Sequence, residues 1–198
     1  MKLDQPRIIP CTDDEIDPEN RPTFEAFAKG NNGRVLNIFR TLARHPKLMK
    51  RWLVFANHVL GGSTLPVRER ELAILRTGYV AGSGYEWAQH VNIARHCGIT
   101  DAEIEAIVTG PDAPGWSAED STLLRATDQL LNDRFIDDAT WAALSTRWDE
   151  QQRMDLVFAV GQYNLVSMAL NTFGVQIEPE VDRFPAAQFV GNRFPHRS

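Results

Sequence analysis

The fold is decided by residues 68–99, which read RERELAILRTGYVAGSGYEWAQHVNIARHCGI. Apolar residues recur three and four positions apart on either side of a short Gly82-Ser83-Gly84 turn, which is the period of an α-helix. Ser83 is followed three residues later by Glu86, the pattern of a capping box that opens a helix. The segment therefore predicts two helices that fold against each other as a hairpin.

Three side chains of this hairpin are candidates for acid–base chemistry. Glu86 and His90 are four residues apart on one predicted helix, so their side chains share a face. Glu71 lies on the preceding helix, on the same stripe as Ile74 and Leu75, and the turn brings it towards that face. Two carboxylates and an imidazole beside an apolar wall shift one another's pKa values and supply general acid–base groups.

Simpler interpretations of the same residues stay open. Glu86 is also the third residue of the capping box, and this role alone would explain it. Glu71 can pair with Arg68 or Arg76, and a lone Glu-x-x-x-His pair is usually a surface pair. The spacing from Glu86 to His90 differs from the Glu-x-x-His of di-iron bundles and the His-Glu-x-x-His of zincins. We therefore expect neither a metal nor another cofactor.

Helical signals continue outward from the hairpin in both directions. Apolar residues from Val35 to Leu42 recur at helical spacing, and Pro46 starts another helix that stops at Gly61-Gly62. Downstream, no window of alternating β-branched residues competes with the helical pattern, so the predicted class is all-α. The expected helix starts there are Thr100, Ser117, Asp137 and Asp149, and Gly174 is the expected stop of the last and longest helix.

Prolines and turn residues divide the chain into three parts. Residues 1–33 read as a proline-punctuated acidic arm, and residues 34–178 as the helical domain. Residues 179–198 form a second arm, whose aromatics are free to dock on a neighbour. These aromatics are Phe184, Phe189 and Phe194.

Composition limits the partners and the compartment. The chain has 198 residues, 21 cationic and 26 acidic side chains and a net charge of −5, so the basic footprint of a nucleic-acid binder is missing. No apolar run approaches the roughly 18 residues of a membrane span, and the N-terminus shows no secretory signal. We expect a soluble cytoplasmic protein with no nucleic-acid and no membrane partner.

The two cysteines point away from thiol chemistry. Cys11 and Cys97 lie 86 residues apart, which excludes a Cys-x-x-Cys redox pair and a cysteine-based zinc site. Cys97 lies near an expected helix end, whose partial negative charge raises a thiol pKa.

Residues 68–98 resemble the carboxymuconolactone decarboxylase family, which includes the alkylhydroperoxidase D group. The resemblance rests on the 19-residue spacing from Glu71 to His90, the Tyr85-Glu86-Trp87-x-x-His90 run and the Ala94-x-x-x-Gly98-Ile99 ending. It covers about residues 35–178, since the stretch from Val160 to Val175 also resembles the closing helix of the family. The resemblance implies an all-helical fold built on a helical hairpin and assembly as a homotrimer or homohexamer.

Two branches of the family imply different chemistry. In the peroxidase branch a Cys-x-x-Cys motif opens the second hairpin helix, and those cysteines correspond to Ser83 and Glu86. Serine and glutamate can neither attack a peroxide nor resolve the product, so this chain departs from that branch.

The decarboxylase branch works without cysteines and keeps a glutamate and a histidine at these positions. The resemblance then implies that His90 donates a proton to a decarboxylated small organic acid or lactone, with Glu86 or Glu71 orienting it. Arg76 and Arg68 are expected to hold the substrate carboxylate, and Tyr85 to line the pocket or bond an enolate. The alternatives are a peroxidase-like antioxidant protein and a non-catalytic oligomer that binds a small molecule.

Overall fold

The computed structural model describes residues 3–182, and every regular element in this range is a helix, which confirms the all-α prediction. The helices are η1 (Pro18–Asn20), α1 (Arg21–Gly30), α2 (Asn37–Leu42), α3 (Pro46–Asn57), η2 (His58–Gly62, a π-helical turn), α4 (Val67–Val80), α5 (Gly84–His96), α6 (Asp101–Thr109), α7 (Ala118–Asn132), α8 (Asp138–Ser145) and α9 (Glu150–Phe173).

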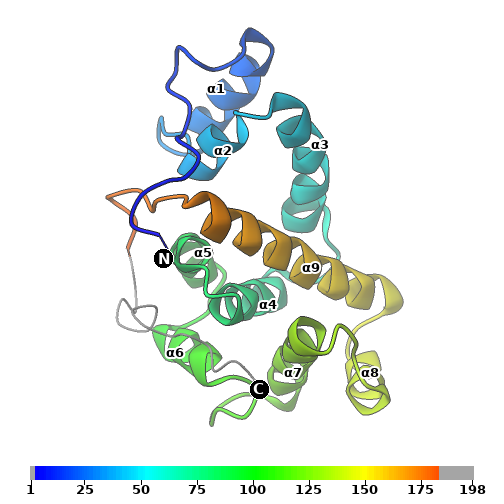
Figure 1. Cartoon of the computed structure of the whole chain (residues 1–198). Helices are drawn as coiled ribbons and strands as arrows, with labels where there is room; N and C mark the ends of the chain where they lie inside the picture. Colours follow the sequence, from blue (N-terminus) through cyan, green and yellow to red (C-terminus); the bar gives the residue numbers. More distant parts are fainter. Residues whose placement is uncertain (1–2, 183–198) are drawn as a thin grey trace.

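Helix α4 is the centre of the domain. Nine consecutive residues, 70–78, are buried, because α5, α7 and α9 pack around this helix. Figure 1 shows α4 and α5 side by side, with the long α9 crossing them and α6 and α7 on the other side. The largest core cluster joins Leu72, Leu75 and Trp87 to side chains of α6, α7 and α9. Any polar side chain on this stretch of α4 must therefore find its partner inside the protein.

The α4–α5 turn has the local chemistry expected of a hairpin. Gly82 has a φ of 62°, a left-handed conformation that costs glycine nothing. The Ser83 hydroxyl accepts a hydrogen bond from the backbone N–H of Glu86 and caps α5. A Cβ on Gly78 would lie 3.5 Å from the Glu86 Cβ, an ordinary van der Waals distance, so the two helices are in close contact at this point. Glu71 is thereby brought next to the first turns of α5.

Helix α9 begins and ends where local signals place it. Asp149 and Gln152 form a complete capping box, and Gly174 ends the helix with a φ of 70°. Along its inner face Leu156, Val160 and Tyr163 are buried against the domain. This long helix covers the α4–α5 hairpin and contributes Tyr163 to its polar cluster.

Residues 3–33 contain more regular structure than the proline-rich pattern predicts. Pro22 lies in the first turn of α1, where the backbone N–H that proline lacks would have no partner within the helix. Cys11, Ile16 and Phe24 are buried in a second apolar cluster with Ala43 and Met49. A proline at a helix start and a proline that breaks a helix look alike in the sequence, so α1 was not anticipated.

The expected C-terminal arm lies mostly beyond the described range. The aromatic side chains predicted to dock on a neighbour, Phe184, Phe189 and Phe194, fall outside the described residues. Among residues 3–182, no helix has both the length and the apolar character needed to cross a membrane.

Candidate functional site

The α4–α5 hairpin brings Glu71, Glu86 and His90 together. The Nδ1 atom of His90 lies 2.7 Å from Oε2 of Glu71, and its Nε2 atom lies 3.0 Å from Oε1 of Glu86. The side chains of Glu71, Glu86 and His90 are 0%, 7% and 6% exposed. One imidazole is therefore held between two buried carboxylates from two helices.

This arrangement favours the charged imidazole. An imidazole can donate hydrogen bonds from both nitrogens only when it is protonated, and both nitrogens here face carboxylate oxygens. Burial opposes the charge, but the attraction and hydrogen bonds of Glu71 and Glu86 outweigh it and raise the pKa of His90 to about 10. The cluster therefore stores a proton at His90 at neutral pH.

Glu86 does more than cap its helix. The Ser83 hydroxyl accepts from the Glu86 backbone, but the Glu86 carboxylate contacts His90. In α6, by contrast, the Glu103 carboxylate accepts from the Thr100 backbone and completes a capping box. The geometry thus favours the acid–base interpretation of Glu86 over the helix-cap interpretation, because its carboxylate contacts the His90 imidazole.

Tyr163 of α9 covers the imidazole from the side. Its ring meets the His90 ring edge-on, with 4.9 Å between centroids and 86° between planes. Burial, followed by the negative charges of Glu86 and Glu71, raises the pKa of Tyr163 well above its usual value. The phenol therefore stays neutral and can donate a hydrogen bond beside the cluster.

Arg70 supplies a buried cation next to the cluster. Its Nε lies 3.8 Å from Oε1 of Glu71, too far for a hydrogen bond, and neither atom has a hydrogen-bond partner among the described residues. Its side chain is 8% exposed. The positive charge of Arg70 thus offsets the negative charge of Glu71. The Arg70 Nε–H group is still available to donate a hydrogen bond.

Arg68 and Arg76 lie on α4 but bind carboxylates of other helices. Arg68 donates to both Asp120 oxygens at 2.8 and 3.0 Å, and also to Glu103. Arg76 donates to both Asp128 oxygens at 2.6 and 2.8 Å. A further Arg76 donor binds the carbonyl oxygens of Ile107 and Val108 at the end of α6. The structure therefore does not bring these two arginines together with His90, and it places them in the packing of α4 against α6 and α7.

Tyr85 also points away from the cluster. Its hydroxyl donates to Glu178 Oε1 at 2.8 Å and accepts from the Ile38 backbone N–H at 3.3 Å. Gln89 and the backbone N–H of Asn37 donate to the same Glu178 carboxylate. Tyr85 thus ties α5 to the start of α2 and to the segment after α9.

The sequence analysis did not assign Arg70 and Tyr163 to the site. Tyr163 interrupts an apolar helix, a signal that a buried polar group needs a partner, but spacing along one helix does not reveal which neighbour it meets. Arg70 stands among Arg68, Glu69 and Glu71, and nothing local distinguishes it from its neighbours.

Neither cysteine has the features of a reactive thiol. Burial, with the negative charge of Glu71 as the next cause, raises the pKa of Cys97. Burial also raises the pKa of Cys11. Thiols of this kind carry little thiolate at neutral pH. Within residues 3–182, no three His, Cys, Asp or Glu side chains are placed to hold a metal ion.

Comparisons with known proteins agree with this fold. The sequence model of the Carboxymuconolactone decarboxylase family matches residues 46–129, the segment from α3 into α7. No curated protein matches the chain.

Solved structures share the architecture at low sequence identity. An uncharacterized peroxidase-related protein from Silicibacter sp. TM1040 is similar with a TM-score of 0.76 and 17% identity, covering 91% of this chain and 93% of its own. A peroxidase-related protein with an alkylhydroperoxidase AhpD core, from Ralstonia eutropha JMP134, has a TM-score of 0.79 and 16% identity over 88% and 93% of the two chains. The debrominase Bmp8 has a TM-score of 0.71 and 15% identity over 92% and 95%. At these identities the likeness establishes the shared fold.

Proposed function

We propose that this chain, a member of the carboxymuconolactone decarboxylase family with an AhpD-like fold, is a cofactor-independent enzyme that acts on a small organic acid or lactone. The reaction is a decarboxylation, or a proton transfer between an enol and its keto form. One observation carries the proposal: both nitrogens of the buried His90 lie within 3.0 Å of carboxylate oxygens.

The chemistry assigns a role to each member of the cluster. In a decarboxylation the bond between the carboxylate and the ring carbon breaks, carbon dioxide leaves, and the electron pair remains on the lactone as an enolate. His90 then gives its Nε2 proton to the enolate carbon and becomes neutral. Glu71 holds Nδ1 and fixes the orientation of the ring. A proton from water then returns to Nε2 by way of Glu86, which is slightly more exposed than Glu71.

Arg70 is the cation beside this cluster that suits an anionic substrate. Arg68 and Arg76 each donate two hydrogen bonds to one carboxylate, whereas Nε of Arg70 has no hydrogen-bond partner within residues 3–182. A guanidinium binds a carboxylate with both charge and geometry. Since the cluster is almost enclosed, a substrate reaches His90 only when a covering side chain such as Tyr163 moves.

The proposal is tested by turnover of small lactone carboxylates, beginning with carboxymuconolactone, followed as loss of the lactone and release of carbon dioxide. We expect His90→Ala to lower kcat by about 10²–10⁴-fold, the usual contribution of a general acid, while the fold survives. His96→Ala is the matched control, because His96 is exposed on the same helix. Activity of His90→Ala within a factor of two of the parent would contradict the assignment.

The oligomeric state and the cellular compartment of the protein are also proposed. We propose a homotrimer or homohexamer in the cytoplasm, with a small molecule as the other partner. An exposed apolar face on α3 and α9 supports self-association, since single soluble chains rarely leave such a face uncovered.

A further inference from the structure

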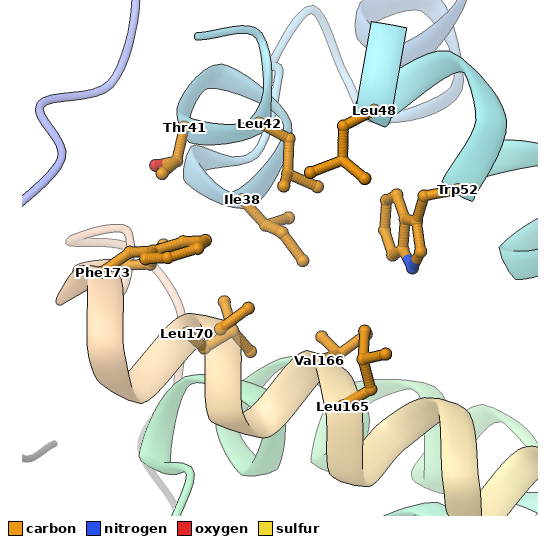
Figure 2. Close-up of a pocket in the computed structure, with 11 residues that line it drawn as sticks. Ile38, Thr41, Leu42, Leu48, Trp52, Leu165, Val166, Leu170 and Phe173 are labelled. Atoms are coloured by element: carbon orange, nitrogen blue, oxygen red, sulfur yellow. The ribbon is translucent and has the colours of Figure 1, made fainter. Parts of the chain in front are cut away.

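A cavity lies between α2, α3 and α9, apart from the acid–base cluster. Its volume is about 110 Å³, and its walls expose no polar surface. Figure 2 shows side chains of α2 and α3 facing those of α9 across the space. The main contributors are Ile38, Leu42, Leu48, Trp52, Leu170 and Phe173.

Water is a poor occupant of this space. A buried water molecule needs two to four polar partners, and the only polar atoms of the lining side chains, the Thr41 hydroxyl and the Trp52 indole nitrogen, contribute no polar surface to the space. Apolar cavities of about 150 Å³ stay dry and take up benzene, so a space of this size suits one small ring or a short hydrocarbon chain. The cavity opens at a rim where Leu48 and Leu165 are 50% and 51% exposed, so a bound molecule can extend outward.

The segment of the chain that carries α2 and α3 is rich in positive charge. Residues 34–68 contain seven lysines and arginines and not one carboxylate, although the whole chain has a net charge of −5. Four of the seven, Arg34, Arg40, Arg44 and Arg68, pair with acidic residues outside this stretch.

Three cations at the start of α3 remain exposed. Lys47, Lys50 and Arg51 are on the surface, and no ion pair in the described part of the chain includes them. Lys47 directly precedes Leu48 and Arg51 directly precedes Trp52 in the chain, and both Leu48 and Trp52 line the cavity.

Folding alone does not account for these cations. Lys47 and Arg51 are like charges four residues apart, a pairing that destabilises a helix. Lys47 also stands in the first turn of α3, where the helix dipole disfavours positive charge. An anion at the rim would relieve both effects.

We propose that this cavity binds a small amphipathic carboxylate, with its ring or short chain between α2, α3 and α9 and its carboxylate at Lys47 and Arg51. The apolar walls select the tail, and the charged rim selects the head group. The cavity walls include none of Glu71, Glu86 and His90, so this binding site is separate from the proposed catalytic cluster. Its occupancy can therefore be measured whether or not a catalytic substrate is known.

The test is titration calorimetry of the full chain with 3-phenylpropanoate, compared with 3-phenylpropan-1-ol, which has the same tail without the charge. We expect saturable binding of the acid, on the order of tenfold tighter than the alcohol. The double variant K47E/R51E should weaken acid binding by at least about tenfold and leave alcohol binding unchanged. The matched control R21E/K29E, with the same change in net charge on exposed residues of α1, should leave both unchanged.

Variants of the cavity test the position of the tail. Ala169→Phe places a ring in the cavity, and Leu165→Trp, at a half-exposed position, blocks the rim without demanding a change in the core. Both should abolish binding of the acid, while Ala142→Phe on the exposed side of α8 should not. The proposal is overturned by equal affinity for acid and alcohol, by unchanged binding in both cavity variants, or by binding to anionic lipid vesicles without binding of the dissolved acid. His90→Ala should bind 3-phenylpropanoate as the parent does, which separates this result from the catalytic proposal.

Discussion

The imidazole of His90 is surrounded by groups that stabilise its protonated form. Glu71 holds one nitrogen at 2.7 Å and Glu86 the other at 3.0 Å, and solvent is almost excluded from all three side chains. In such surroundings each charge interaction is stronger than in water. The ionisation of His90 is therefore the most direct experimental report on the cluster.

The first prediction concerns this ionisation. NMR titration of the His90 ring should show it protonated well above the ordinary histidine value of 6.5, with a pKa of about 10. Glu86→Gln should lower this pKa, because it removes the carboxylate beside Nε2, while the variant keeps the fold of the parent. Glu119→Gln, an exposed residue in the first turn of α7, is the matched control. A His90 pKa at the ordinary value, with the ring open to solvent, would make the cluster an unimportant surface pair.

The same shift predicts how stability depends on pH. The pKa of His90 is higher in the folded protein than in the unfolded chain, so folding gains free energy from the proton. That gain is complete below about pH 6.5 and is lost as the pH rises towards about 10. Urea unfolding of the parent should therefore show falling stability over this window, and His90→Gln should flatten the slope. Parallel curves for the two proteins would contradict the prediction.

Single residues are also the basis for a prediction of no thiol peroxidase activity. Ser83 and Glu86 replace the cysteines of the peroxidase branch, and both Cys11 and Cys97 have raised pKa values. Consumption of an organic hydroperoxide with a dithiol reductant should therefore stay at the uncatalysed rate. Cys11→Ala and Cys97→Ala should behave as the parent does, and turnover that either substitution abolishes would favour the antioxidant alternative.

At the scale of helices, α4 is buried along residues 70–78 and carries charged residues that pair with α5, α6 and α7. Glu71 binds α5, Arg68 binds α6 and α7, and Arg76 binds α7 and the end of α6. Gly110, which follows α6, has a φ of 105°, a conformation that favours glycine, and a Cβ there would lie 2.8 Å from the Arg76 guanidinium. These ion pairs orient the helices around the hairpin.

At this scale we predict how much the Arg76–Asp128 ion pair contributes to the free energy of unfolding. Its side chains are 10% and 20% exposed, so Asp128→Ala would leave a buried guanidinium without its carboxylate. We expect a loss of about 3–5 kcal/mol in the free energy of unfolding, measured in urea. The control is Asp112→Ala, whose pair with Arg125 is largely exposed and is worth about 1 kcal/mol or less.

The same variant distinguishes structure from substrate binding. If Arg76 acts only in packing, Asp128→Ala at a temperature where it remains folded should keep the His90 titration of the parent. A changed His90 pKa in the folded variant would connect Arg76 to the site after all.

At the scale of the whole molecule, one apolar face has no partner within residues 3–182. Val54, Met154 and Phe158 are more than half exposed, and the Phe55 ring meets Phe158 edge-on between α3 and α9. Apolar patches of this kind mark protein interfaces. The face lies beside the α9 segment that covers the hairpin, so association there would restrict the movement of α9.

We predict that this face joins copies of the chain. Sedimentation velocity at micromolar concentration should show a stable trimer or hexamer, and Phe158→Asp should dissociate it by burying a charge without a partner. Ala142→Asp on exposed α8 should not change the assembly. A parent protein that sediments as a monomer would contradict the prediction.

Local signals in the sequence located most helix boundaries. Thr100 and Asp149 start helices in capping boxes, and Gly174 stops α9, because each depends on hydrogen bonds or backbone angles within a few residues. The convergence of Glu71 with Glu86 and His90 was also within reach, since a four-residue spacing and a tight turn limit where those side chains can go. The helix α1 was not, because Pro22 gives the same signal at the start of a helix as in an arm.

The sequence by itself determined the helical class, the hairpin, the pairing of Glu86 with His90 and the absence of a dithiol motif, all of which depend on residues close together in the chain. Only the tertiary structure decided the partners of long side chains on α4 and α5. Arg68 and Arg76 bind carboxylates 52 residues away, and Tyr85 binds Glu178, 93 residues away. The physical reason is that a buried guanidinium or phenol points to whichever neighbour satisfies its hydrogen bonds, and that neighbour is set by how whole helices pack.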